Sequence, residues 1–417
     1  MKILYFSFEY PPFLVGGLGT YAYEMARRIA RRGHSVTVFA KNPGNLPTSD
    51  LEEGVEIHRP LTVDATDLLP LIVPEDVKRW PPYAQTYFAE VFVYNILSST
   101  KVCNQLVRAE QRNFDLIVAH DWISGMAGIT CKKDLKKPFV FHLHSVEEGR
   151  VGDGSPTVKN LERLTAKTAQ VVITVSYAMR DQLISLGYEE GKIRVIYNGV
   201  DERKYDPSTV KEEEVMELRE KLGVGEDPMI LFIGRLSWVK GADALVRAMP
   251  LILAEVPNAK LVILGKGEQE RMLRDLIRQL GVEKNVITEF QYVSERERIL
   301  HYAAADVAVF PSKYEPFGIV ATEAMSMGKP VVVGAKGVSG LREQVISSGP
   351  ERCGAHVDPD DPRDIAKFTV EILKDEKLRK ELGRNARKRV LERFTLDRTA
   401  DNTLRVYEEV LQNNSAG

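Results

Sequence analysis

Short runs of apolar residues alternate along the chain with segments in which apolar residues recur every three or four positions. In the first half, the apolar runs cover residues 3–8, 36–40, 116–119 and 140–142, and the helical patterns cover residues 18–32 and 87–109. Strands that alternate with helices are typical of a parallel sheet covered by helices. The first half is therefore predicted to be an α/β domain.

A second alternating series follows after residue 201. Its predicted strands cover residues 230–233, 261–264, 286–288, 307–310 and 331–333, and its predicted helices cover 242–254, 269–280 and 320–327. A charged segment, 202–226, holds the start of the connection and a helix near 212–221. We predict an α/β fold of two doubly wound, Rossmann-like domains, 1–201 and 202–394, that face a deep cleft, with a C-terminal helix, 395–411, packed back on the first.

Length and composition support two globular domains and exclude some classes of function. A chain of 417 residues is too long for one core, and 44% hydrophobic and 28% charged residues give no sign of disorder. The net charge of -2 provides no global field for nucleic acid. We expect no signal peptide and no membrane-spanning segment.

The three cysteines, Cys103, Cys131 and Cys353, lie far apart in the sequence. Their odd number and spacing argue against a disulfide framework and a zinc site, which favours a reducing, cytoplasmic location. A proline-rich stretch, 61–82, interrupts the α/β pattern, and both an acceptor-side loop and a plain surface excursion remain open for it.

Gly16-Gly17-Leu18-Gly19 lies between the first strand and the first helix. Glycines allow backbone amides to approach an anion, and the helix N-terminus adds partial positive charge. The spacing differs from the dinucleotide fingerprint G-x-G-x-x-G. A phosphate contact and a simple tight turn both fit this motif.

Gly234-Arg235-Leu236, followed by Lys240-Gly241, occupies the equivalent place in the second domain. Arg235 offers a planar fork and Lys240 a compact charge, so the pair suits a diphosphate. Two solvated loop cations are the alternative. Ligands of open α/β sheets bind beyond the carboxyl ends of the strands, which favours the functional interpretation.

The motif from Glu315 to Glu323 follows the predicted strand 307–310 and continues into a helix. Both carboxylates can face one ligand, although helix N-termini favour acidic residues in any case. The backbone amides of Phe317, Gly318, Ile319 and Val320 lie at the predicted helix start, where a phosphate or a sugar hydroxyl binds well. We expect Glu315 and Arg235 to be exposed in a cleft.

His120-Asp121-Trp122 and His142-Leu143-His144 each end an apolar run. Their spacing fits a shared cleft better than a tetrahedral metal site. A histidine in such a position is often structural, but the arrival of both motifs at strand ends favours a sugar contact from His144.

In this order, the motifs resemble those of the retaining GT-B glycosyltransferases, in the glycosyltransferase 4 and glycogen synthase-like group. Further elements of the resemblance are Gly33-His34-Ser35-Val36, Asn198-Gly199-Val200-Asp201 and Gly265-Lys266-Gly267. The resemblance covers nearly the whole chain. It implies a hexosyltransferase that uses a nucleotide sugar such as UDP-glucose or ADP-glucose in carbohydrate biosynthesis.

The resemblance also implies a role for each matching residue. Arg235 and Lys240 would hold the diphosphate, Glu315 the sugar hydroxyls, and Glu323 the ribose. His144 and Asp121 would approach the sugar, and Gly17 would cap the phosphate. The remaining donor contacts would come from Gly16, Asn198, Gly265, Tyr292, Phe317, Gly318, Ile319 and Val320. No metal and no other cofactor is implied, since the cations take the place of a metal.

The acceptor stays open. Leu14 stands where glycogen and starch synthases typically carry a lysine, which points to the acceptor-diverse branch of the family. A lipid or small-molecule acceptor at a membrane surface is one alternative, with Arg27, Arg28, Arg31 and Arg32, and Lys132, Lys133, Lys136 and Lys137, as peripheral contacts. A sugar epimerase or phosphorylase and a non-catalytic nucleotide-sugar-binding module are the others. The sequence does not fix the oligomeric state.

Overall fold

The computed structural model describes residues 1–14 and 16–415, and the chain divides into two compact units. Unit 1 comprises Met1–Val175, Arg180–Tyr197 and the residues from Asp397 on, and unit 2 comprises Ser176–Met179 and Asn198–Leu396. The chain thus passes to unit 2 at Asn198, close to the boundary drawn after residue 201 from the sequence. Within the described residues, no helix is both long and apolar enough to cross a bilayer.

Unit 1 is built on a sheet that, in its described part, has eight strands in the order β3-β4-β2-β1-β5-β6-β7-β8. Neighbouring strands are parallel except for the β3–β4 hairpin, which the sequence pattern did not predict. The strands are β1 (Lys2–Phe6), β2 (Ser35–Phe39), β3 (Ser49–Glu52), β4 (Val55–His58), β5 (Leu116–His120), β6 (Phe139–Leu143), β7 (Val171–Thr174) and β8 (Ile193–Val195).

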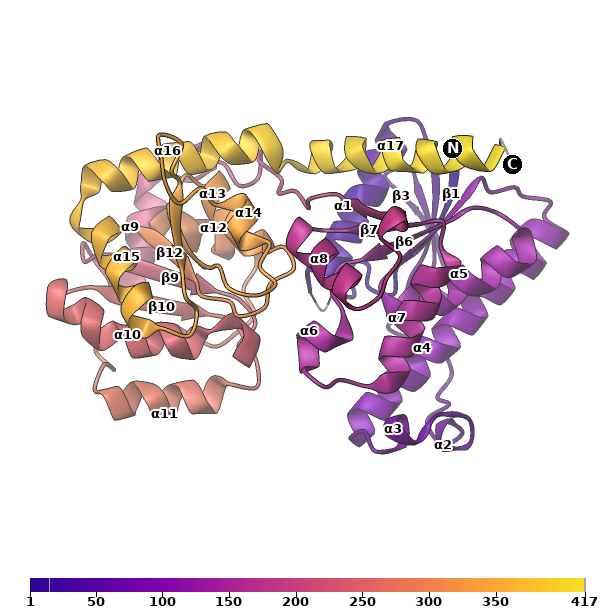
Figure 1. The fold of residues 1–417 in the computed structure, drawn as a ribbon, viewed down its shortest axis with the longest axis horizontal. Helices are drawn as coiled ribbons and strands as arrows, with labels where there is room; N and C mark the ends of the chain where they lie inside the picture. The colour runs from indigo at the N-terminus through magenta and orange to yellow at the C-terminus, as the bar shows by residue number, and fades with distance from the viewer. Residues whose placement is uncertain (15, 416–417) are drawn as a thin grey trace. The chain divides into compact units, whose positions relative to one another are not determined.

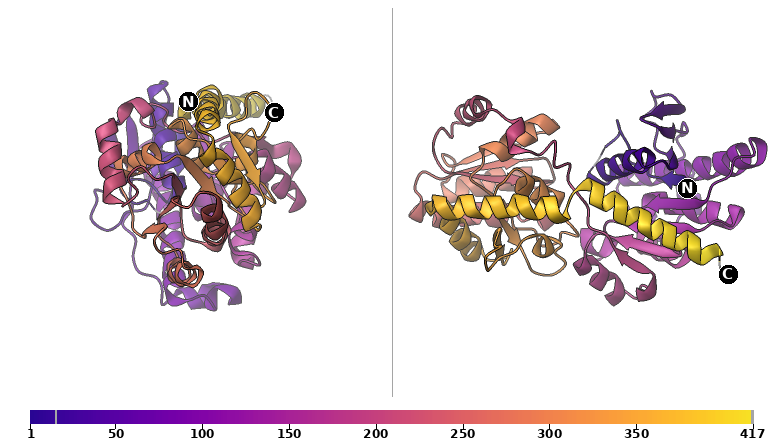
Figure 2. Two further views of the ribbon diagram at one scale, coloured as in Figure 1. Left: turned by 90° about the vertical axis from the view of Figure 1, so that its left-hand side faces the viewer. Right: turned by 90° about the horizontal axis from the view of Figure 1, so that it is seen from above.

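The longer helices of unit 1 connect these strands, and shorter ones lie in the loops. They are α1 (Gly17–Arg31), α2 (Leu69–Ile72), α3 (Glu75–Lys78), α4 (Pro82–Thr100), α5 (Trp122–Leu135), α6 (Glu147–Val151), α7 (Pro156–Thr168), α8 (Tyr177–Ser185, whose first residues belong to unit 2) and α17 (Leu396–Ser415). Helix α17 returns to unit 1 from Asp397 and lies along it in each view (Figure 1 and Figure 2).

Unit 2 has a second sheet, six-stranded in the described residues and parallel throughout, with the order β11-β10-β9-β12-β13-β14. The strands are β9 (Met229–Ile233), β10 (Lys260–Leu264), β11 (Val286–Glu289), β12 (Val307–Phe310), β13 (Val331–Gly334) and β14 (Gly354–Val357). The helices are α9 (Glu212–Lys221), α10 (Ala242–Glu255), α11 (Glu270–Leu280), α12 (Glu295–Ala304), α13 (Ile319–Ser326), α14 (Leu341–Gln344), α15 (Pro362–Lys374) and α16 (Glu376–Arg393).

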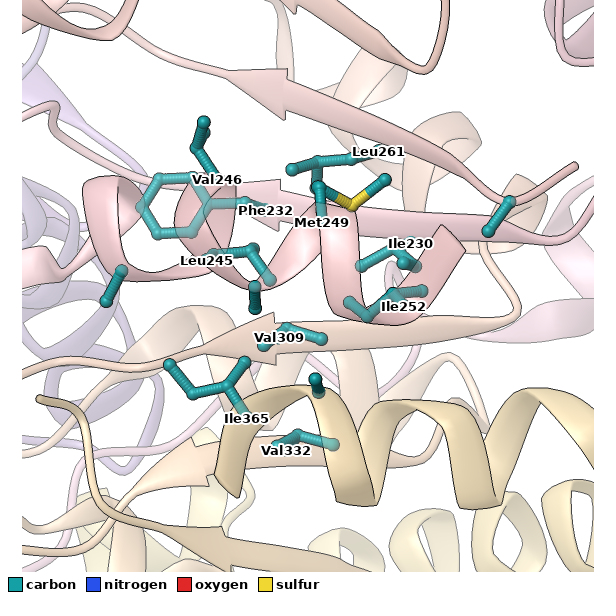
Figure 3. Packing of buried hydrophobic residues seen from close by; sticks show 14 of the residues in the cluster. Ile230, Phe232, Leu245, Val246, Met249, Ile252, Leu261, Val309, Val332 and Ile365 are labelled. Atoms are coloured by element: carbon teal, nitrogen blue, oxygen red, sulfur yellow. The ribbon is translucent and has the colours of Figure 1, made fainter. Parts of the chain in front are cut away.

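The core of unit 2 forms where one face of this sheet meets α10 and α15. Figure 3 shows Leu245, Met249 and Ile252 of α10 packed near Ile230 and Phe232 of β9. All are almost fully buried, and each large apolar side chain contributes about 1.5–3 kcal/mol relative to exposure. This packing fixes the ends of β9, β10 and β12, from which the polar loops of unit 2 emerge.

Three sequence-based expectations for unit 1 need correction. The helix predicted over 87–109 begins earlier, at Pro82, because proline suits the first position of a helix, and its last part, Lys101–Ala109, is a π-helix. The stretch 61–82 contains the short helices α2 and α3. Cys103 and Cys131, distant in the sequence, are free thiols in the core with their sulfur atoms 4.0 Å apart.

Candidate functional site

Polar side chains gather at the carboxyl ends of the strands in each unit, and the two groups are described separately. In unit 2, β9 ends at Ile233 and is followed by Gly234 and Arg235. The chain then makes a 3₁₀ turn, Trp238–Lys240, and enters α10 through Gly241, whose φ is 71°. Lys240 is thereby held at the start of a helix.

Close approaches between the strand ends require glycine at two of these positions. A Cβ atom on Gly241 would lie 2.0 Å from the carbonyl oxygen of Pro311, and one on Gly265 would lie 1.9 Å from that of Gly234. Both glycines also have positive φ. The loops after β9, β10 and β12 are therefore locked together, and this brings Lys240 to the motif that begins at Glu315.

Lys240 and Glu315 form an ion pair. The Lys240 ammonium lies 2.5 Å from Glu315 Oε2, and the two side chains are 27% and 10% exposed. The backbone of Glu315 is fixed as well, because its N–H donates to Val338 O and its carbonyl accepts from the Gly340 N–H. Glu315 is thus buried, contrary to the expectation that it is exposed; the fold places a positive charge against it.

The start of α13 lies directly after Glu315. Gly318 precedes the helix with a φ of 99°, and a Cβ atom there would meet Leu341. The first amides of a helix have no acceptor within it, so those of Ile319 and Val320 are suited to an anion or a hydroxyl. Phe317 is buried, and its carbonyl accepts a hydrogen bond from the Gln344 side chain, which anchors this turn.

Glu323 lies inside unit 2. Its carboxylate accepts a hydrogen bond of 2.8 Å from the Tyr302 hydroxyl and lies 3.7 Å from the Arg298 guanidinium. Arg298 also donates to the Tyr205 hydroxyl, and the Glu323 carboxylate raises the pKa of Arg298. The sequence did not point to Arg298 and Tyr302, because nothing local marks residues 21 to 25 positions away as partners of Glu323.

Other predicted donor contacts of unit 2 differ in exposure. Arg235 has a side chain that is 73% exposed, with its guanidinium 3.6 Å from Glu268. Tyr292, in the loop after β11, is 84% exposed. Asn198 is buried, and its Oδ1 has no hydrogen-bond partner in the described structure. Asn198 therefore retains a free acceptor, whereas its neighbour Gly199 packs tightly on the backbone of Thr395.

In unit 1, the glycine loop after β1 is organised by Glu9. The Gly16 N–H donates to Glu9 Oε2 over 3.1 Å, and Gly17 begins α1. Gly19 lies so close to Glu9 and Leu14 that a side chain would clash. Glu9 was not singled out from the sequence, although it lies within the motif that continues to the glycines.

Asp121 has a strained backbone, with φ 52° and ψ 173°, at the start of α5. Such conformations cost about 1–3 kcal/mol in non-glycine residues and concentrate at functional sites. The Asp121 Oδ1 atom accepts a hydrogen bond of 2.7 Å from the His144 N–H, and the Asp121 N–H donates to His142 O. Asp121 thus fixes the backbone that carries His144.

Burial sets the protonation states at this edge. Desolvation raises the pKa of Asp121 to about 6, although the positive charge of Arg150 opposes the shift. Desolvation lowers the pKa of His144 to about 3 and also lowers those of His120 and His142. The three imidazoles are therefore neutral near pH 7.

The three histidines form a stacked, hydrogen-bonded group. Potential ligand atoms of His120, His142 and His144 lie within 4.8 Å of one another. However, the ring planes are within 20° to 33° of parallel, so their nitrogen lone pairs do not converge as those of zinc ligands do. His120 Nδ1 lies 3.2 Å from His144 Nε2, and His142 Nε2 lies 2.8 Å from the Tyr407 hydroxyl.

Two family descriptions match these two groups of residues. Glycosyltransferase Family 4 matches residues 15–204, and Glycosyl transferases group 1 matches residues 214–389. An uncharacterized glycosyltransferase of Methanocaldococcus jannaschii is 35% identical over 99% of both chains. The chain belongs to the family 4-like glycosyltransferases.

More distant relatives agree with this assignment. The glycogen synthase of Mycobacterium tuberculosis is 28% identical to this glycosyltransferase over 98% of its chain and 94% of the relative. The catalytic domain of Starch Synthase IV from Arabidopsis thaliana, solved with ADP and acarbose, has a TM-score of 0.76 at 18% identity over 99% of both chains. The second likeness establishes the fold, which is of the GT-B kind with two Rossmann-like domains.

Tyr407 of the glycosyltransferase links α17 to the histidine group. Replacing Tyr407, which is fully buried, with phenylalanine leaves the Nε2 atom of His142 without its partner and is expected to lower the free energy of unfolding by about 1–3 kcal/mol. Urea denaturation measures this change. Tyr83→Phe is the control, since Tyr83 is 78% exposed; equal effects in both variants would contradict a role for the Tyr407–His142 bond.

Asp121 gives the glycosyltransferase a pH-dependent stability. Its pKa is higher in the folded chain, about 6, than the usual 3.8. The folded state therefore binds the proton more tightly, and stability falls as pH rises from about 4 to about 6, by at most about 3 kcal/mol. Asp121→Asn is expected to flatten this slope and to be more stable at pH 7.

Urea denaturation at several pH values between 4 and 7 measures this effect. A Trp238→Phe background leaves Trp80 and Trp122, both in unit 1, as the fluorescent tryptophans. An unchanged slope in Asp121→Asn would show that Asp121 is not the titrating group; Glu162, whose pKa burial raises to about 7, would then be the next residue to replace.

Proposed function

We propose that this glycosyltransferase is a retaining, metal-independent hexosyltransferase that moves glucose from a nucleotide diphosphate sugar to a hydroxyl acceptor. The observation that carries the proposal is the Lys240–Glu315 pair beside the first amides of α13. This edge of unit 2 combines a cation, a carboxylate and backbone donors. A sugar diphosphate presents the complementary groups, namely hydroxyls and anionic oxygens.

Arg235 and Lys240 would bind the diphosphate and stabilise the charge that develops as the nucleotide leaves. Lys240 has an anionic partner, Glu315, before the donor binds, so its ammonium is already positioned. Arg235 is exposed, and its contact with Glu268 is long at 3.6 Å. It is free to turn toward a ligand. Two fixed cations supply the charge that a divalent metal supplies in other transferases.

His144 would donate or accept a hydrogen bond with a hydroxyl of the donor sugar. Its pKa of about 3 makes it a poor proton acceptor near pH 7. The Asp121 carboxylate is bound to the His144 N–H and serves to position it. We therefore propose that a phosphate oxygen of the donor takes the proton of the acceptor as it attacks from the face that the nucleotide leaves. This course retains the anomeric configuration.

The proposed acceptor is a carbohydrate, in keeping with the glycogen synthase among the relatives. A lipid or small-molecule acceptor remains the alternative within the same chemistry. Neither changes the roles proposed for Arg235, Lys240 and Glu315, because the donor is common to both.

A thermal-shift panel of UDP, ADP, GDP and their glucose and mannose conjugates tests donor recognition. A ligand that binds only the folded state raises the apparent melting temperature in proportion to its affinity. We expect a clear shift with one nucleotide and a smaller shift with that nucleotide in Lys240→Ala. No shift with any compound at saturating concentration would contradict the proposed donor.

A further inference from the structure

Unit 1 carries two groups of basic residues outside the candidate site, and the structure separates them. The arginines of α1 face carboxylates: Arg27 lies 2.8 Å from Glu53, and Arg32 lies 2.7 Å from Asp401. Arg28 and Arg31 are paired in the same way, with Glu24 and Glu53. The arginines are thus neutralised within the chain. The lysines that follow α5 are not.

These lysines surround an open hollow, here called the lysine hollow. It is lined by Ile129, Lys132, Lys133, Lys136, Lys137, Thr168 and Gln170. Gln170 directly precedes β7, and its side chain accepts a hydrogen bond from the N–H of Phe139, the first residue of β6. The hollow therefore lies at the amino ends of the strands, whereas His120 and His144 lie at their carboxyl ends. It is a different site from the one described above.

The positive charge of the hollow is not balanced locally. Asp134 lies on the same helix, but its two oxygens accept hydrogen bonds of 2.7 and 2.9 Å from Arg108. Throughout the described residues, Lys133, Lys136 and Lys137 take part in no ion pair. Lys132 donates instead to the carbonyl of Thr168 and to Gln170 Oε1.

Lys132 is the member under most electrostatic pressure. Burial lowers its pKa, and the nearby ammonium of Lys192 lowers it further. A partly buried ammonium beside like charges is unfavourable in the empty state. A bound anion would relieve both effects, because it replaces lost solvation and screens the repulsion.

A second, independent observation comes from the backbone of Lys136. It lies in the left-handed region, with φ 55° and ψ 32°, at the C-terminus of α5. Glycine or asparagine usually occupies this position, because a Cβ atom is strained there. Strained residues persist where the side chain has a use. The chain places a lysine there, and its ammonium group joins the others at the hollow.

We propose that the lysine hollow binds a phosphate-bearing anion, either a soluble oligophosphate or the headgroup of an anionic lipid. Several ammonium groups around one concavity match the several charges of such a group. Since the hollow lies at the opposite end of the strands from the candidate site, the bound anion regulates or anchors the enzyme and is not its substrate.

Binding of tripolyphosphate, measured by calorimetry in about 0.1 M salt, tests this site. The protein is used in an Arg235→Ala/Lys240→Ala background, so that the proposed donor site does not contribute and its failure cannot affect the result. Lys133→Gln/Lys137→Gln is expected to weaken binding about tenfold. Lys2→Gln/Lys284→Gln, which removes the same charge from two exposed positions, is expected to change it less than about twofold.

Lys136→Gly separates binding from folding. Glycine relieves the backbone strain, so the melting temperature is expected to stay the same or rise. The loss of the ammonium group is nevertheless expected to weaken tripolyphosphate binding about threefold or more. A purely structural lysine would leave binding unchanged, and that result would overturn the proposal.

Cosedimentation with vesicles identifies the source of the phosphate group. Binding to phosphatidylglycerol vesicles, absent with phosphatidylcholine and lost in Lys133→Gln/Lys137→Gln, would assign the hollow to a lipid headgroup. Binding to tripolyphosphate alone would assign it to a soluble anion. Binding to neither, or equal losses in the Lys2→Gln/Lys284→Gln control, would overturn the proposal.

Discussion

Replacing Lys240 with alanine is expected to lower kcat/KM for sugar transfer by about a thousandfold, the upper part of the range for losing one preorganised group that stabilises developing charge. Lys240 is held 2.5 Å from Glu315 in a mostly buried pair. Its ammonium is therefore in place before the donor arrives and needs no reorganisation when the nucleotide leaves. Release of the free nucleotide, measured under kcat/KM conditions, checks this expectation.

Two further variants make the Lys240 result specific. Lys284→Ala removes an exposed lysine of the same unit and is expected to have no effect. Glu315→Gln tests the pair, because it leaves Lys240 without its anion. If the two residues act together, Lys240→Ala/Glu315→Gln will lose less activity than the two single losses combined. A loss of less than about tenfold in Lys240→Ala would contradict its place in catalysis.

Arg235→Ala is expected to lower kcat/KM by about a hundredfold or more without changing the melting temperature. The Arg235 side chain is 73% exposed, so its loss removes little packing. Arg235→Lys is expected to restore only part of the activity, since an ammonium cannot bind a diphosphate with the two-pronged geometry of a guanidinium.

The control for Arg235 is its own neighbour. Glu268→Ala removes the carboxylate 3.6 Å away and is expected to keep full activity, because this contact is long and exposed. Full activity in Arg235→Ala, or an equal loss in Glu268→Ala, would show that the guanidinium does not act on the donor.

The alternation of apolar runs and helical patterns predicted most of the fold. The strands at 230–233, 261–264 and 307–310 and the helix at 242–254 were located to within a residue or so, because buried parallel strands are continuous apolar runs. The hairpin of β3 and β4 was missed. Strand β3, with the sequence Ser-Asp-Leu-Glu, is mostly exposed and carries no apolar run.

The candidate site was predicted less completely, for a physical reason. Strand ends and glycine loops are local features, so Arg235, Lys240 and Glu315 could be named from the sequence. The pairing of Lys240 with Glu315 depends on the close packing of Gly241 on Pro311, which only the fold brings about. The same holds for Tyr407 on His142, 265 positions apart, and for Arg298 on Glu323.

The most direct test of the proposed retaining transfer follows the anomeric proton of the product by ¹H NMR during the reaction. The account predicts that the enzyme, without added metal and with chelator present, releases the nucleotide and forms a glycoside with the anomeric configuration of the donor. Lys240→Ala should lack this activity. A product of inverted configuration, or donor binding without turnover for any hydroxyl acceptor tried, would contradict the account.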